Sequence, residues 1–520
     1  MLNWQQKLTR FFSCFTAIAL AISVSYTTVT VPAWAEVTHS PQSNSIETYL
    51  ENFSDRITEF SLRNGMKFIV LENHDAPVVS FVTYADVGGV DEPDGQTGVA
   101  HFLEHLAFKG TKEIGTKDYQ LERLYLKRLD TVFAQIEAAE AAGDQAKLKQ
   151  LNQEFSRLQS ITNSFVEQNE YGRIVDTAGG VGLNAATSAD YTSYFYSFPS
   201  NKLELWMSLE SERFLEPVFR EFYKEKQVIL EERRLRTDNS PLGKIIEQFL
   251  DTAFSKHPYK RPTIGYNEDI RNLTRENVRD FFNKYYTPNN LTFVIAGDVE
   301  PQEVEKFAQV YFGRFPKQPE PPEVTIVEPP QQETKEFTLE LPTQPWYLEG
   351  YHIPGVAHPD YPVYEVLSSL LSGGRTSRLY QSLVEKQQVA LFAEGFSGFP
   401  GDKYPNLMLF YAQTAPSHTV DELATALREQ INLLKTQPVS QTELNRVKTQ
   451  LKASLLRRLD SNMGMARLLA EYEAKTGSWR KLFDDLQTIE EVTLEDIQRI
   501  AQTTFTPENR TVGKLLSSQQ

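Results

Sequence analysis

The spacing of hydrophobic and polar positions predicts a small sheet and then a helix near the start of the globular chain. Residues 57–62, 67–71 and 78–84 have the apolar content of strands, and Asn64-Gly65 between the first two is a hairpin signal. Apolar residues then recur at helical spacing over residues 98–108. The pattern therefore predicts strands followed by a helix.

A second pattern covers residues 119–169, which are rich in Leu, Glu, Gln, Lys and Ala. Two apolar stripes at helical spacing flank the turn signal Ala142-Gly143-Asp144. The first stripe is Leu121, Leu124, Leu129, Val132, Phe133 and Ile136, and the second is Leu148, Leu151, Phe155, Leu158 and Ile161. We expect a helical hairpin, and we favour a structural insertion that packs on its domain over a partner-binding arm.

The chain also divides into two related halves. A Pro- and Glu-rich stretch at 315–337 is typical of an extended linker. The interval from Thr274 to Thr287 equals that from Thr493 to Thr506, and each interval holds a predicted helix that leads towards a strand. This repetition predicts an α/β (α+β sandwich) fold of two related domains. The domains are 55–314, with the hairpin inserted, and 338–516, each a mixed, largely antiparallel sheet packed by helices.

Composition narrows the function classes. Of the 520 residues, 40% are hydrophobic and 12% aromatic, as in a globular protein. The formal net charge is −16 and no Lys/Arg-rich run is present, which argues against nucleic acid or an anionic membrane as the main partner. A basic or extended peptide suits this surface better.

The first 35 residues have the pattern of an export signal. Lys7 and Arg10 precede an apolar stretch, and Ala33-Trp34-Ala35 is a small-x-small cleavage site. The alternative is an uncleaved membrane anchor, which would be the only contact with a membrane. We expect a periplasmic or extracellular protein, or a lumenal one. The only cysteine, Cys14, lies in this segment, so a metal site in the mature chain must use His and carboxylates.

The main chemical signal is His101-Phe102-Leu103-Glu104-His105. Residues four apart share one face of a helix, so both imidazoles can reach one metal ion. Glu104 lies on nearly the same face, where its carboxylate can act as general base towards water on the metal. Two surface histidines beside a salt-bridged glutamate are the alternative, but the surrounding helix is too apolar for a solvated face.

A zinc site with two His ligands usually needs a third protein ligand, most often a carboxylate. A predicted helix at 221–234 is rich in carboxylates. Glu225 and Glu232 lie seven residues apart and therefore share a face, which suits a supporting partner and a ligand. Spacing alone does not choose between Glu231 and Glu232.

These motifs resemble the pitrilysin/insulysin zinc peptidases, and among them the half-length, mitochondrial processing peptidase-like group. The resemblance covers about residues 55–515. It implies one Zn²⁺ per chain bound by His101, His105 and Glu232, with Glu225 supporting the site and Glu104 as general base.

The resemblance also assigns a role to the segment Gly182-Leu183-Asn184-Ala185-Ala186-Thr187. In the family this segment is an edge strand to which the substrate adds as a further strand, so Asn184 and Ala185 would contact the substrate backbone. From the residues alone, the segment is an ordinary loop-to-strand junction.

Two departures from the family pattern matter. The interval from His105 to Glu232 is long by about the length of the hairpin, which an insertion explains. Active relatives also carry an Arg and a Tyr seven residues apart in the second half, where this chain has Val384 and Leu391. We therefore expect a heterodimer with a related subunit that supplies the Arg/Tyr pair. The alternative is local substitution by Arg375, Arg378 or Tyr380.

Alignment of the halves places Tyr364, Leu367 and Ser368 where the metal motif would recur, so we expect no zinc in the second half. The sequence as a whole predicts a zinc-dependent endopeptidase acting on peptides or unfolded polypeptides held as an added strand in a chamber. One alternative is a non-catalytic assembly subunit of a processing-peptidase-like complex. Another is a zinc-buffering module, which would have no use for Glu104.

Overall fold

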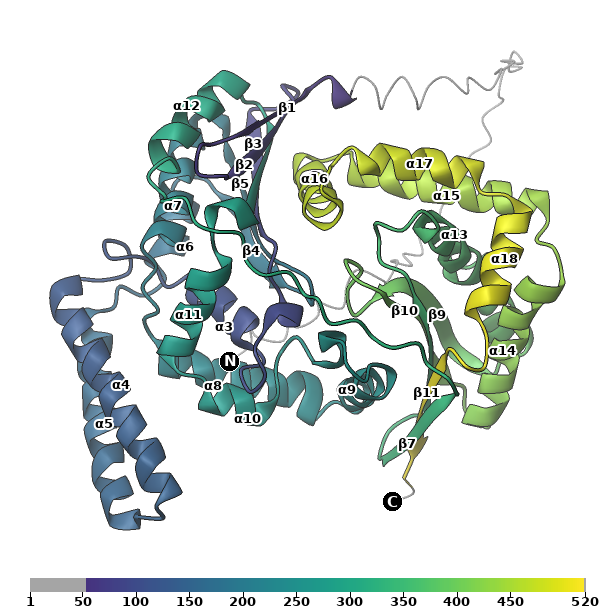
Figure 1. Ribbon diagram of the computed structural model, residues 1–520, viewed down its shortest axis with the longest axis horizontal. Helices are drawn as coiled ribbons and strands as arrows, with labels where there is room; N and C mark the ends of the chain where they lie inside the picture. The colour runs from purple at the N-terminus through teal and green to yellow at the C-terminus, as the bar shows by residue number, and fades with distance from the viewer. Residues whose placement is uncertain (1–52, 519–520) are drawn as a thin grey trace, which may run out of the picture. The chain divides into compact units, whose positions relative to one another are not determined.

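The computed structural model describes residues 53–518, so the export signal expected at 1–35 lies outside the described residues. Two sheets form its framework (Figure 1). The first sheet has the order β1-β2-β6-β3-β5-β4 and the second β7-β11-β8-β10-β9. In each sheet one pair is parallel, β2 with β6 and β7 with β11, and the other neighbours are antiparallel. The strands are β1 (Ile57–Ser61), β2 (Lys67–Glu72), β3 (Val78–Ala85), β4 (Val181–Thr187), β5 (Thr192–Pro199), β6 (Leu291–Gly297), β7 (Lys335–Leu341), β8 (Trp346–Ile353), β9 (Ala390–Phe399), β10 (Asn406–Thr414) and β11 (Arg510–Ser517).

The two halves repeat one order of elements, which confirms the prediction of two related α/β domains. Without β1, the first sheet has the same strand order and the same position of its parallel pair as the second. The helices of the first half are α3 (Val99–Leu106), α4 (Tyr119–Ala141), α5 (Gln145–Phe165), α6 (Glu170–Thr177), α7 (Leu203–Leu215), α8 (Phe222–Arg233), α9 (Pro241–Ala253), α10 (Asn267–Asn272), α11 (Arg275–Tyr285) and α12 (Pro301–Tyr311). Those of the second half are α13 (Tyr361–Ser372), α14 (Val420–Thr436), α15 (Gln441–Arg458), α16 (Asn462–Thr476), α17 (Lys481–Glu491) and α18 (Leu494–Thr504).

The helices also correspond in pairs. Helices α7 to α11 lie between β5 and β6, and α14 to α18 lie between β10 and β11. The equivalence expected from Thr274 and Thr493 is present, because each residue caps its helix (α11 or α18) with a capping box, and each helix leads to the strand that forms the parallel pair.

Each half lends one helix to the other half's sheet. Helix α16 of the second half covers one face of the first sheet, where Met465 and Leu469 are buried with Val82 and Val294 (Figure 1). Helix α9 of the first half covers the second sheet in the same way. Each sheet is thus covered on both faces. Two of the apolar cores contain residues of both halves.

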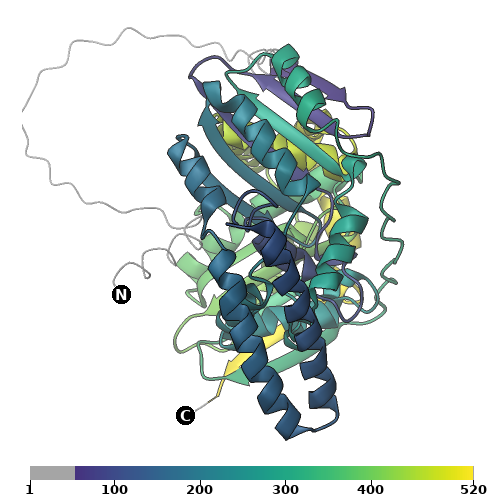
Figure 2. The same cartoon turned by 90° about the vertical axis from the view of Figure 1, so that its left-hand side faces the viewer.

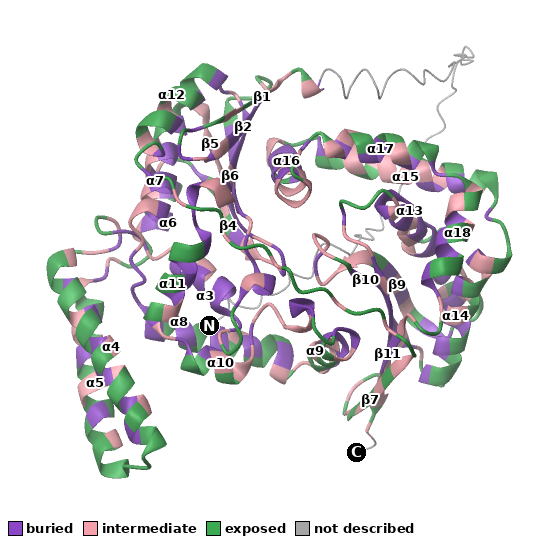
Figure 3. Ribbon diagram, viewed as in Figure 1, coloured by how far each residue is buried: buried purple, intermediate pink, exposed green. Residues whose placement is uncertain are grey.

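The hairpin expected at 119–169 is formed by α4 and α5, and Figure 2 shows it projecting from the rest of the domain. The interpretation of its first stripe was wrong at two positions, because Leu121 and Leu124 are 46% and 57% exposed (Figure 3 shows α4 largely exposed). The buried stripe instead begins at Glu122, whose carboxylate accepts hydrogen bonds from Arg220 at 3.0 and 3.2 Å. A buried ion pair therefore sets which face of α4 turns inward.

Candidate metal centre

Helix α3 is held in place by a buried carboxylate and by aromatic packing. Gly98 precedes the helix with a positive φ of 87°, and Glu92 accepts hydrogen bonds at 2.9 Å from the N–H groups of Gly98 and Ala100. Burial raises the pKa of Glu92 to about 8 despite these bonds. Phe102 stacks on Phe222 of α8, with ring centroids 4.7 Å apart. This packing sets α3 against α8.

Three side chains from these two helices converge. Glu232 Oε2 lies 3.6 Å from His105 Nε2 and 3.9 Å from His101 Nε2, and ligand atoms of the three residues all lie within 4.8 Å of one another. A tetrahedral zinc ion with bonds of about 2.0–2.2 Å places its ligand atoms roughly 3.4 Å apart. Among residues 53–518, this is the group of His, Cys, Asp and Glu side chains that meets the geometric requirement for a metal ion. The donor set fits zinc.

Charge and burial also favour metal binding. Burial lowers the pKa of His101 to about 3, with help from the neighbouring His105 and Arg236, so this imidazole is neutral at pH 7 and can act as a ligand. Arg236 Nη1 contacts Glu232 Oε1 at 2.8 Å, which leaves Oε2 facing the histidines. Arg236 lies in η3 (Arg234–Asp238), a short π-helical turn that continues α8.

The neighbouring acids differ in what they face. Glu231 is 53% exposed and accepts a hydrogen bond from Arg234 at 2.8 Å, away from the histidines. Glu225 Oε2 lies 3.5 Å from His105 Nδ1, and its Oε1 accepts a hydrogen bond from Lys109 at 2.6 Å. Burial alone would raise the pKa of Glu225, but these two partners hold it below its ordinary value. Glu225 therefore remains charged and can orient the His105 ring.

Glu104 is held by a residue that the sequence argument did not assign. The Thr187 hydroxyl, at the end of β4, donates a hydrogen bond of 2.6 Å to Glu104 Oε2. Burial raises the pKa of Glu104, and this hydrogen bond opposes the rise. Thr187 is the last residue of the segment that resembles the family's edge strand. Its place in that segment is the feature of the sequence that could have pointed to a role at the site.

Strand β4 is one of the two edge strands of the first sheet, and among residues 53–518 its partner is β5. Asn184 is exposed on it and Ala185 is buried. The N–H of Ala185 is bonded to Asn184 Oδ1 at 2.9 Å. An edge strand can accept a further strand beside it, and the Ala185 N–H would then have to exchange Asn184 Oδ1 for a carbonyl of that strand.

Comparison with known proteins identifies the family of this chain. The family model described as Insulinase (Peptidase family M16) matches residues 67–127 and 158–267, and the one described as Peptidase M16 inactive domain matches residues 272–451. The chain belongs to the M16 peptidase family. The break between the matched segments of the first model falls within the α4–α5 hairpin, as expected for an insertion.

Relatives of this M16 chain carry peptidase names. It is 28% identical over 465 residues to the zinc protease PqqE of Helicobacter pylori, covering 88% of this chain and 92% of that one. It is 25% identical to the probable mitochondrial-processing peptidase subunit beta of Schizosaccharomyces pombe, covering 85% and 87%. The crystal structure of a protease from H. pylori superimposes with a TM-score of 0.74 at 27% identity, covering 88% and 99%. The periplasmic protease PqqL of Escherichia coli shares the fold (TM-score 0.66, 17% identity), covering 89% of this chain and 48% of that one.

Proposed function

We propose that this M16 chain is a zinc endopeptidase acting on peptides or unfolded polypeptides. The observation that carries the proposal is the half-buried Glu104 carboxylate, which lies one residue before His105 of the His101/His105/Glu232 group and is held by Thr187. A zinc-buffering module needs the ligands but has no need for an oriented base next to them.

In the proposed hydrolysis each residue of the site has a separate role. Zinc, when bound, would polarise the scissile carbonyl and acidify water at the site. Glu104 accepts a proton from the attacking water and delivers it to the leaving amine. Thr187 fixes the carboxylate orientation, and Glu225 orients His105. Strand β4 binds the substrate backbone along its free edge, with contacts at Asn184 and Ala185.

We also propose that catalysis needs a related subunit. Val384 packs against the core of the second half and Leu391, on the edge strand β9, is 50% exposed, and neither side chain can donate a hydrogen bond to a substrate carbonyl. Arg378 forms two 2.9 Å hydrogen bonds with Glu443, which weighs against its acting as a local substitute. A heterodimer with a relative bearing the Arg/Tyr pair supplies the donors. A non-catalytic assembly subunit is the second candidate, favoured by the same two apolar residues.

Two further assignments belong to the proposal. We infer export, from the signal pattern at 1–35 together with the periplasmic neighbour PqqL. None of the helices described between residues 53 and 518 has both the length and the apolar character needed to span a bilayer. We place the domain boundaries at 55–314 and 338–516, joined by the linker at 315–337.

The test is a comparison of residues 36–520 purified alone and after co-expression with a relative that carries the Arg and Tyr. Zinc is quantified by mass spectrometry, and turnover is measured with a quenched peptide library. We expect about one zinc per chain in both samples and strong activity only in the pair. Activity of the pair that survives Glu104→Gln in this chain would assign catalysis to the partner and establish the assembly role instead.

A further inference from the structure

A short π-helical turn carries Arg236 to the edge of the metal group. Helix α8 ends at Arg233, and η3 (Arg234–Asp238) continues it with a wider turn. Turns of this kind are rare and occur frequently at functional sites. Arg233 anchors the turn, because its guanidinium donates a hydrogen bond of 2.6 Å to the Gly265 carbonyl and forms a 2.9 Å ion pair with Glu247 of α9. The backbone beneath Arg236 is therefore fixed to two neighbouring segments.

Helix α9 also packs closely on this turn. A Cβ atom at Gly243, in the first turn of α9, would lie 2.1 Å from the carbonyl oxygen of Arg236 and 2.8 Å from the Cα atom of Thr237. Both separations are shorter than van der Waals contact, so only glycine allows α9 to approach so closely. The side chain of Arg236 thus extends from a backbone that has little freedom to move.

The two acids at the end of α8 pair with arginines in different settings. Glu231 and Arg234 are both more than half exposed and form an ordinary surface pair. Glu232 is 20% exposed, with Oε2 within 3.9 Å of both imidazoles and Oε1 2.8 Å from Arg236 Nη1. Arg236 therefore holds the oxygen of the expected ligand that does not face the histidines.

The number of oxygens that Glu232 offers decides what else a metal ion can bind. A carboxylate coordinates a metal ion through one oxygen or through both. A catalytic zinc site has three protein ligands and keeps the fourth position for water or substrate. A second oxygen from Glu232 would compete for that position. The charge-assisted hydrogen bond from Arg236 opposes this, because Oε1 would have to give up that bond before it could reach the ion.

We propose that Arg236 is a positioning residue that restricts Glu232 to coordination through Oε2 and thereby keeps a position on the metal open to substrate. This role rests on the proposed peptidase function, since a purely structural zinc site needs no open position. Burial raises the pKa of Glu104, and Arg236 is among the groups that oppose the rise. The guanidinium thus lies near the general base as well as near the ligand, as expected for a residue that borders the open position.

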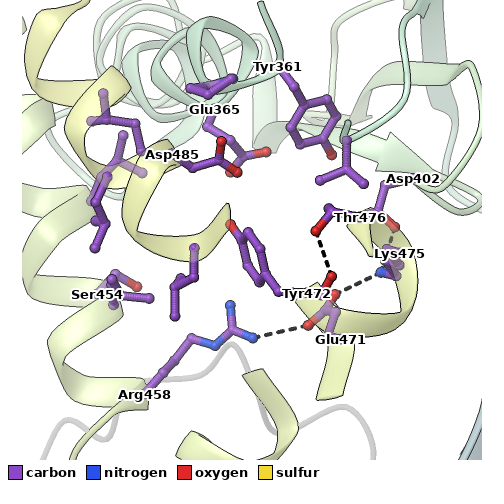
Figure 4. A pocket seen from close by; sticks show the side chains of 17 residues that line it. Tyr361, Glu365, Asp402, Ser454, Arg458, Glu471, Tyr472, Lys475, Thr476 and Asp485 are labelled. Atoms are coloured by element: carbon purple, nitrogen blue, oxygen red, sulfur yellow. Dashed lines mark hydrogen bonds and ion pairs between the residues drawn. The ribbon is translucent and has the colours of Figure 1, made fainter. Parts of the chain in front are cut away.

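Cobalt(II) tests this role without turnover, because its visible absorption weakens when a four-coordinate site gains a ligand. The intact chain is loaded with Co²⁺, and zinc affinity is measured in parallel. We expect Arg236→Met to weaken the absorption while zinc affinity changes by no more than about 5-fold, and Arg236→Lys to retain part of the intensity. Arg458 forms a 3.3 Å ion pair of similar exposure with Glu471 in the second half (Figure 4), so Arg458→Met is the matched control and should give the parent spectrum.

Turnover of a quenched peptide, with the Arg/Tyr-bearing relative present, is the second readout. Arg236→Met should lower kcat by about 10–100-fold with little change in KM, and Arg236→Lys should restore part of it. If no sample turns over peptide, the proposed peptidase function fails and the Co²⁺ spectra alone decide the role of Arg236. An Arg236→Met spectrum that matches the parent's, or an equal weakening in Arg458→Met, overturns the proposal.

Discussion

The third metal ligand gives the sharpest test, because three acids of α8 make a graded series. Glu232 Oε2 lies within 3.9 Å of both imidazoles. Glu225 contacts His105 at Nδ1, the ring nitrogen that faces away from Glu232, and Glu231 contacts Arg234 and is exposed to solvent. We therefore expect Glu231→Gln to leave zinc affinity unchanged. Glu225→Gln removes a partner of a ligand, a change that typically weakens metal binding 10–100-fold, or about 1.4–2.7 kcal/mol. Glu232→Gln removes a ligand itself, so its loss should exceed that of Glu225→Gln.

Zinc affinity is measured by competition with a chromophoric chelator at pH 7, and circular dichroism checks that each variant is folded. The Glu232→Gln change also breaks the contact with Arg236, whose side chain is 56% exposed, and an ion pair with such a solvated partner contributes only about 0–1 kcal/mol. Arg236→Gln serves as the control for that contribution. If Glu231→Gln released the metal and Glu232→Gln retained it, the assignment of ligands from this geometry would be wrong.

Three further predictions concern Glu104, Thr187 and His257. Glu104→Gln should keep zinc but lower turnover by about 10²–10⁴-fold, because an amide cannot accept the proton; near-normal turnover would exclude Glu104 as the base. Thr187→Val should lower kcat with little change in KM or zinc content, and Thr187→Ser should restore it; an equal loss in both would mean that the hydroxyl is not what matters. Burial lowers the pKa of His257 from 6.5 to about 4, so the unfolded chain binds a proton there that the folded chain does not. Stability should therefore fall as pH drops from 6.5 to 4, by up to about 3 kcal/mol, and His257→Gln should flatten that slope in denaturant titrations.

Local patterns were sufficient to predict much of this structure. The strands and α3 follow from apolar spacing and turn residues, and the two histidines of the metal group follow from their i, i+4 spacing on that helix. Glu232 was assigned from the family resemblance, because spacing left Glu231 and Glu232 both open. The duplication was visible in two equal intervals because both helices begin with a Thr capping box. In each case the information lies within a short stretch of chain, where spacing and capping determine conformation.

What could not be predicted depends on contacts between distant segments. The inward face of α4 is set by the pairing of Glu122 with Arg220, 98 residues away in sequence. The role of Thr187 depends on β4 ending beside α3, and the burial of Phe195 depends on α16 crossing to the first sheet. Helix α16 has an apolar pattern that would suit its own domain equally well. Spacing within a helix says which face is buried but not against which sheet.

The crossing of α9 and α16 gives the second half a role that is independent of its chemistry. The face of the first sheet opposite α3 is apolar at Val82 and Val294, and α16 removes both residues from water. Strands β3, β5 and β4 are neighbours in that sheet, so the packing of α16 on one face steadies the strand whose end holds Glu104 through Thr187. A second half without a metal motif or an Arg/Tyr pair would still be required, because without it the face of the first sheet opposite α3 would be exposed apolar surface.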